Sequence, residues 1–144
     1  MTETTGTAGT TTAYPSRDAI RQTVLGYVKG LENSEFDAVA DLFADDAFYS
    51  HPPFDPDSPK RAEVIGREAV RALLKGRRGT RKWFHEIQTL FVADDRCLIE
   101  GIVRESEGGP IRSSFAGAGT FDAEARITRW VAYRSVPAIG ESLD

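Results

Sequence analysis

The hydrophobic periodicity of this chain changes near residue 81, and no other feature constrains its fold as strongly. Up to that point, apolar residues recur at helical spacing. Beyond it, apolar and polar residues alternate in segments divided by turn residues, at 83–92, 97–103, 111–121 and 126–134. Helices followed by hairpin-linked strands are typical of an α+β domain, in which a curved antiparallel sheet carries helices on one face.

Three helices are expected before the strands. The first follows Ser16, a residue type that can cap a helix, and the second begins at the capping-box pattern of Ser34 and Asp37. The second helix stops near Ala44, and the third extends from about Arg67 to Lys75, between two glycines. The apolar stripe of the first helix consists of Ile20, Val24, Tyr27, Val28 and Leu31.

The composition indicates one soluble, cytoplasmic domain. A chain of 144 residues can bury an adequate core, and its single cysteine excludes an intrachain disulfide. We find neither a leader pattern nor an apolar run of membrane-spanning length. The net charge of -4 argues against nucleic acid as a partner, and we interpret the basic residues 77–82 as a solvated loop. We expect a flexible tail over residues 1–15, one domain over 16–136 and a C-terminal tail over 137–144.

The segment LFADDAFYSHP, residues 42–52, contains one of only two histidines in the chain. We predict a helix end, a tight turn at Asp45–Asp46 and a strand that delivers His51, followed by a proline-rich loop over 52–59. An imidazole has an ordinary pKa of about 6.5, so it can transfer protons near neutral pH. His51 is therefore a candidate base at a cavity wall, and the alternative is a structural histidine bonded to a backbone carbonyl.

The run from Tyr27 through residues 42–47 to His51–Pro52 resembles the nuclear transport factor 2-like superfamily, which includes ketosteroid isomerase, limonene epoxide hydrolase and the SnoaL-like polyketide cyclases. The resemblance extends over roughly residues 18–134, because a third helix and long hairpins follow in the same order. It implies a cystatin-like α+β barrel, in which a cone-shaped antiparallel or mixed sheet wraps three N-terminal helices. An apolar pocket that opens to solvent and a homodimer are further implications of this resemblance.

The resemblance also assigns candidate site residues. The isomerase tyrosine that donates to a developing oxyanion falls on Tyr27, and the proton-shuttling carboxylate falls on His51. The protonated aspartic acid of the isomerase falls near Gly117, which has no side chain to donate, and this difference argues against a true ketosteroid isomerase. The Asp, Arg and Asp pattern of the epoxide hydrolase is not reproduced either. Without the resemblance, Tyr27 is better explained as core packing with its hydroxyl satisfied.

Glu100 is the third candidate, because it interrupts an otherwise apolar strand. We place it on the cavity side together with Leu98, Ile102 and Arg104, where a carboxylate can pair with a base or act as an acid. The opposite alternation, with Ile99 inside, would leave Glu100 in water. The residues expected to line the pocket and bind substrate are Tyr49, Trp83, Leu98, Ile102, Phe115, Gly117 and Trp130.

The resemblance to SnoaL-like polyketide cyclases, taken with these residues, implies a cofactor-free cyclase that encloses an apolar, polyketide-type intermediate of secondary metabolism. It would promote ring closure, including cycloaddition, by preorganisation. His51 would serve as base or hydrogen-bond partner, with Tyr27 and Glu100 as donor or orienting groups. The alternatives are an epoxide hydrolase, dehydratase or isomerase in the same pocket, and a noncatalytic small-molecule-binding or dimerisation module. No metal site is expected, because His51 and His85 lack supporting ligands.

Overall fold

A computed structural model of the chain describes residues 13–55, 57–77 and 83–143. In these residues the helices are α1 (Arg17–Glu32), α2 (Phe36–Ala40) and α3 (Arg67–Arg77). The strands are β1 (Phe43–His51), β2 (Ala62–Ile65), β3 (Phe84–Ala93), β4 (Arg96–Arg104), β5 (Ile111–Phe121) and β6 (Ile127–Ser135). The predicted α+β class is confirmed. Most of the expected N-terminal tail, and residues 78–82 of the basic segment, lie outside the described residues.

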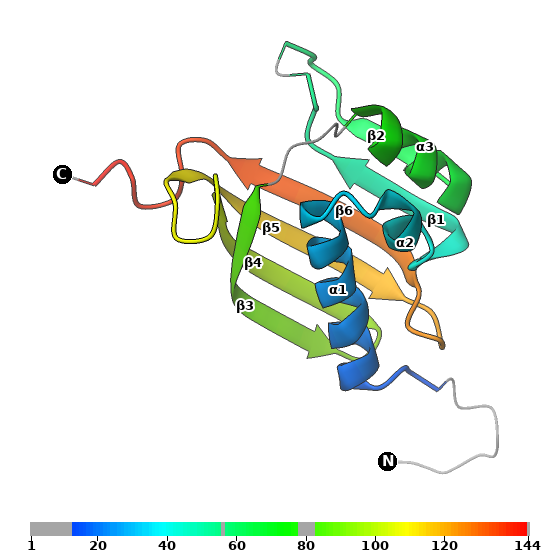
Figure 1. Cartoon of the computed structure of the whole chain (residues 1–144). Coiled ribbons are helices and arrows are strands. Elements are labelled where there is room, and N and C mark those ends of the chain that lie inside the picture. Colours follow the sequence, from blue (N-terminus) through cyan, green and yellow to red (C-terminus); the bar gives the residue numbers. More distant parts are fainter. Residues whose placement is uncertain (1–12, 56, 78–82, 144) are drawn as a thin grey trace.

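The described strands form one mixed, six-stranded sheet in the order β2-β1-β6-β5-β4-β3. β1 runs parallel to β6, and the other neighbouring pairs are antiparallel. The sheet is open, because β2 and β3 are its two edges. Figure 1 shows α1 lying across the sheet, with α2 and α3 beside β1 and β2. Among the described residues, no helix is long and apolar enough to cross a membrane.

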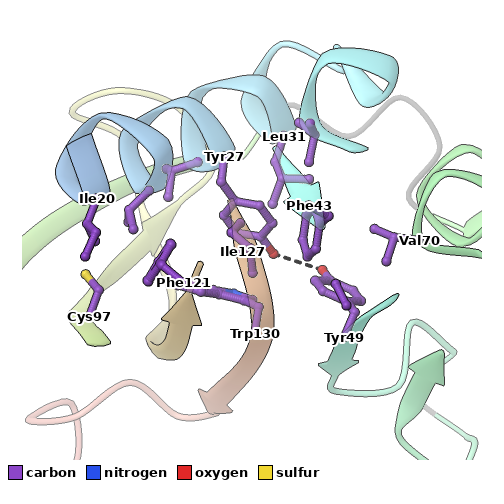
Figure 2. Packing of buried hydrophobic residues seen from close by; sticks show 14 of the residues in the cluster. Ile20, Tyr27, Leu31, Phe43, Tyr49, Val70, Cys97, Phe121, Ile127 and Trp130 are labelled. Carbon is purple, nitrogen blue, oxygen red and sulfur yellow. Dashed lines mark hydrogen bonds between the residues drawn. The ribbon is translucent and has the colours of Figure 1, made fainter. Parts of the chain in front are cut away.

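The first helix forms as the sequence predicts. The Ser16 hydroxyl accepts a hydrogen bond from the backbone N–H of Ala19 at 3.0 Å, which satisfies one of the amides at the helix start. Every residue of the expected apolar stripe is buried. In Figure 2, Ile20, Tyr27 and Leu31 point from α1 toward the sheet. The core therefore lies between α1 and the inner face of the sheet.

Three predictions around the second helix are wrong. The helix ends at Ala40 and not near Ala44, because Ala44 already lies in β1. The helix begins after Glu35 without a side-chain cap, and Ser34 instead adopts a positive φ of 57°. Asp45 and Asp46 form no turn between elements, because both lie within β1, where the pairing with β6 is irregular. Arg67 stabilises this irregular stretch, since its guanidinium donates to the Phe43 carbonyl at 2.8 Å and pairs with Asp45 at 2.9 Å.

The short strand β2 was not predicted. It pairs antiparallel with β1, from Phe48 opposite Ile65 to His51 opposite Ala62. Four residues at a sheet edge carry little periodic signal, and here two of them are exposed. The described residues between His51 and β2 form irregular structure, as the prolines predict.

Candidate functional site

A cavity of about 90 Å³ lies between α1 and the inner face of the sheet. Its floor comes from β4, β5 and β6, and its sides come from α1, the end of β1 and the start of β3. The lining consists of Tyr27, Val28, Leu31, His51, Pro52, Phe54, Trp83, His85, Ile99, Val103, Ser113, Phe115, Ala116, Gly117, Trp130, Ala132, Tyr133 and Arg134. Aromatic and aliphatic side chains predominate, and none of these residues is acidic.

The structure brings most of the sequence-predicted site residues to this cavity. Those that line it are Tyr27, His51, Trp83, Phe115, Gly117 and Trp130. These residues come from one helix, the end of one strand and three further strands or their flanks, so only the tertiary fold unites them. Their roles in catalysis and binding stay predictions.

The predicted cavity-side position of Glu100, Leu98 and Ile102 is wrong. In β4 the buried residues are the odd-numbered ones, so Ile99 and Val103 face the cavity. Glu100 is exposed on the outer face, and Leu98 beside it retains 56% of its accessible surface. Both faces of β4 carry apolar residues, so alternation identified the two faces without showing which one the helix covers.

Tyr49 lies behind the cavity wall and does not line the cavity. Its side chain is fully buried, and its hydroxyl forms a hydrogen bond of 2.9 Å with the Tyr27 hydroxyl. The Tyr27 ring also packs against Trp130, with ring centroids 5.1 Å apart. Figure 2 shows this group, in which Tyr27 descends from α1 to meet Tyr49 and Trp130 on the sheet. The hydrogen bond with Tyr49 therefore fixes the position of the Tyr27 hydroxyl.

His51 lies beside Tyr49, with ring centroids 6.2 Å apart, and two further contacts orient it. Its Nδ1 lies 2.7 Å from the Pro52 carbonyl oxygen, and its ring stacks on Phe54 at a centroid distance of 4.3 Å. A carbonyl can only accept a hydrogen bond, so Nδ1 carries the hydrogen. In the neutral ring, Nε2 is then the basic nitrogen. The carbonyl bond anticipated as a structural alternative therefore also fixes the tautomer that a general base needs.

His85 is a cavity residue that the sequence reasoning did not select. Its Nδ1 lies 3.3 Å from the Glu32 carboxylate, which also accepts the backbone N–H of His85. Both side chains are nearly buried. Burial alone would raise the pKa of Glu32, but the hydrogen bonds from His85 outweigh it and lower that pKa below its ordinary value. One signal in the sequence could have found it. His85 and Ile87 are two positions apart on the strand that follows Trp83, so their side chains are expected on the same face.

Two glycines of β5 make room for Trp130 on β6. A Cβ atom at Gly117 would lie 2.4 Å from Cζ2 of Trp130, and one at Gly119 would lie 2.5 Å from Cε3. The indole of Trp130 therefore lies directly against the backbone of both glycines. Trp130 is 1% exposed, so this packing fixes the floor of the cavity.

The remaining candidates for reactive or ligating groups are structural. Within the described ranges, no three His, Cys, Asp or Glu side chains cluster closely enough to hold a metal ion. Cys97 is buried on the inner face of β4, and burial raises the pKa of its thiol to about 11. A thiol with that pKa is almost entirely protonated at neutral pH and is a poor nucleophile.

An open mixed sheet with N-terminal helices above an apolar cavity is the nuclear transport factor 2-like fold. The chain belongs to the SnoaL-like domain family, whose model matches residues 24–130. No functionally curated protein matches the sequence significantly.

Several solved structures share the fold at low sequence identity. A protein of unknown function with a cystatin-like fold from Methylobium petroleophilum PM1 superposes with a TM-score of 0.66 at 17% identity, over 90% of this chain and 85% of that one. An NTF-2 like protein of unknown function from Burkholderia xenovorans LB400 superposes with a TM-score of 0.63 at 21% identity, over 83% of this chain and 85% of that one. A protein from Shewanella denitrificans OS-217 is described provisionally as a SnoaL-like polyketide cyclase. It superposes with a TM-score of 0.63 at 20% identity, over 83% of this chain and 92% of that one.

Proposed function

We propose that this protein is a cofactor-free enzyme that binds an apolar, polyketide-type intermediate in the cavity and promotes its cyclisation by acid–base catalysis. One observation carries the proposal: two histidines line a single apolar cavity, and each is oriented through Nδ1 by a hydrogen bond. The carbonyl of Pro52 orients His51, and the carboxylate of Glu32 orients His85. In both rings, Nε2 is then the nitrogen that exchanges protons with a substrate.

The arrangement suits an intramolecular aldol reaction. His51 Nε2 removes a proton from the carbon next to a carbonyl, and the resulting enolate attacks a second carbonyl carbon of the same molecule. A carbon–carbon bond forms, the second carbonyl becomes an alkoxide, and an imidazolium returns the proton to that oxygen. The product therefore has the mass of the substrate. The Tyr27 hydroxyl, positioned by Tyr49, is the group that can donate to the enolate oxygen.

The walls of the cavity contribute to catalysis by orienting the substrate, in addition to the proton transfer by the histidines. Phe54, Trp83, Phe115 and Trp130 surround the site with flat apolar surface, which favours a folded chain or ring over an extended one. Binding that holds the two reacting carbons together lowers the entropy cost of ring closure in the chemical step. The enclosed volume is below the roughly 300 Å³ of typical ligand pockets, so a polyketide-sized substrate must also occupy the groove at the mouth.

Membership of the SnoaL-like domain family supports this proposal, as do fold relatives described provisionally as polyketide cyclases. The mainly apolar lining agrees with a polyketide-like substrate, since it offers few groups that could recognise a sugar or nucleotide. We place the activity in the cytoplasm and expect the enzyme to act as a homodimer.

Metabolite conversion by purified protein tests the proposal. Extracts of a strain that lacks this protein are incubated with the wild-type protein and analysed by mass-resolved chromatography. We expect a product of unchanged mass, formed at least about 100-fold more slowly by His51→Ala and more slowly by His85→Gln. Glu100→Gln is the matched control, because Glu100 lies on the outer face, and it should retain wild-type turnover.

Other outcomes distinguish the alternatives. A product that is heavier by one water would indicate hydrolysis in place of cyclisation, and a product that is lighter by one water would indicate dehydration. A product of unchanged mass that forms at the wild-type rate with both histidine variants would shift the catalysis from proton transfer to cavity shape. If no metabolite changes, the protein is better explained as a binding module.

A further inference from the structure

The cavity continues into a wider groove of about 420 Å³. Four residues line both hollows, namely Phe54, Trp83, Ser113 and Arg134. The groove is completed by Pro53, Arg112 and Val136. A ligand in the cavity therefore leaves it between two aromatic side chains and passes two arginines.

The two arginines reach this mouth from neighbouring strands. In β5, Val103 of β4 pairs with Ser113 while Arg104 pairs with Ile111, so Arg112 is the extra residue of a β-bulge. Its guanidinium lies over the Trp83 ring, 4.7 Å from the centroid. On β6, Arg134 lies opposite Phe115, whose side chain lines the cavity. The strand pairing thus brings both guanidinium groups to one side of the opening.

The charge at the mouth is not neutralised locally. Neither hollow has an acidic residue in its described lining. Arg134 forms no ion pair with any residue that the structure describes. Arg112 pairs with Glu105 at 3.2 Å, but both side chains are about half exposed, and such a pair is weak in water. An anion arriving at the mouth therefore meets two guanidinium groups, of which Arg112 is shared with the solvent-exposed carboxylate of Glu105.

Ser113 adds a polar group to the mouth. It is 4% exposed, and it borders both the cavity and the groove. Within the described residues, its hydroxyl is not among the buried polar atoms that lack a hydrogen-bond partner, so it does not by itself require a ligand. A hydroxyl at this position can donate a hydrogen bond to a ligand oxygen.

We propose that the mouth binds the carboxylate of an apolar carboxylic acid, between the guanidinium groups of Arg112 and Arg134 and within reach of the Ser113 hydroxyl. A guanidinium matches a planar carboxylate with two parallel hydrogen bonds. The apolar part of the ligand then extends past Trp83 toward the two histidines. This inference rests on the proposed function and adds its substrate class, because the carboxylate would set which carbon of the chain reaches the base.

Binding of a matched acid and amide tests the site. We would titrate 3-phenylpropionate and 3-phenylpropionamide into the full-length protein by calorimetry at low salt. We expect wild-type protein to bind the acid at least about tenfold more tightly than the amide. Arg134→Gln should reduce this preference to about twofold or less, Arg112→Gln and Ser113→Ala should weaken it, and each variant should melt cooperatively. Arg96→Gln, the same charge change at the distant start of β4, should retain the preference.

Equal binding of acid and amide by wild-type protein would overturn the carboxylate site and leave the apolar cavity standing. Retention of the full preference by an Arg112→Gln, Arg134→Gln double variant would overturn it as well. Binding of neither compound would overturn this inference, whereas the proposed function is decided by the metabolite conversion described above. If the protein prefers the acid over the amide but converts no metabolite, the carboxylate site is supported and the cyclase activity is contradicted.

Discussion

At the scale of single residues, the two histidines reach the same cavity by different local arrangements. His51 bonds to the carbonyl of the next residue in the chain, so its orientation depends on the backbone at the end of β1. His85 depends on Glu32, a side chain 53 positions away at the end of α1. The hydrogen bond of His51 requires no other side chain, whereas that of His85 is lost with one carboxylate. Glu32 is therefore the residue through which the environment of His85 can be tested.

The depressed pKa of Glu32 predicts a contribution to stability that depends on pH. The folded-state pKa lies below the ordinary value of 4.5, so the ionised carboxylate stabilises the fold above pH 4.5 and loses this effect as the pH falls through the folded pKa. At pH 6 we expect Glu32→Gln to be about 1 to 2 kcal/mol less stable than wild type in urea unfolding. The difference should shrink below pH 4. Glu100→Gln should match wild type throughout, and a pH-independent difference for Glu32→Gln would contradict the linkage.

At the scale of elements, the packing of β5 against Trp130 predicts a large effect from one methyl group. In Gly117→Ala the new Cβ would lie 2.4 Å from the indole, so Trp130 or the strand must shift. We expect a loss of about 1 to 3 kcal/mol in the free energy of unfolding. Because Trp130 forms the cavity floor, its fluorescence spectrum should change as well.

Gly76→Ala is the matched control for that substitution. Gly76 lies in the last turn of α3, and an added Cβ would meet no atom within 4 Å. Alanine is the better helix former, so here we expect stabilisation of about 0.5 to 1 kcal/mol. If Gly117→Ala stabilised the protein as Gly76→Ala is expected to do, reduced backbone entropy of the unfolded chain would outweigh contact with Trp130, and the prediction would be wrong.

The same scale shows how far the sequence determines this fold. The apolar stripe of α1 and the long strands β3 to β6 were predicted, because each repeats its period over many residues. The sequence did not predict which face of β4 is buried, since Leu98 and Ile99 are equally apolar and only the position of α1 decides which of them is covered. The edge strand β2 and the irregular start of β1 depend on pairing partners that local sequence does not reveal.

At the scale of the whole molecule, the site is assembled from segments that are distant in sequence. Tyr27 and His51 could be predicted to share a cavity only through the resemblance to the nuclear transport factor 2-like superfamily. His85 and Arg134 lay outside the residues that the resemblance assigned, so no pattern selected them. Their inclusion required the sheet order, which places β3 and β6 on either side of the β4–β5 pair.

The sheet face opposite the helices bears on assembly. Phe91 and Leu98 lie directly opposite each other on β3 and β4, and they are 67% and 56% exposed. Adjacent apolar side chains with this exposure are typical of a contact surface. We therefore expect the predicted homodimer to pair through this face. In sedimentation velocity, wild-type protein should be a dimer at micromolar concentration, and a Phe91→Ser, Leu98→Asp double variant should be a folded monomer.

Ile65→Ser is the control for this experiment, because Ile65 is 71% exposed at the opposite edge of the sheet. Its loss should leave the dimer intact if the contact is confined to β3 and β4. A monomeric wild-type protein would reject the dimer, and a dimer that persists in the double variant would place the contact elsewhere. Because the cavity opens on the helix side, the monomeric variant should retain the preference for 3-phenylpropionate over its amide. Loss of that preference would mean that the second subunit shapes the mouth.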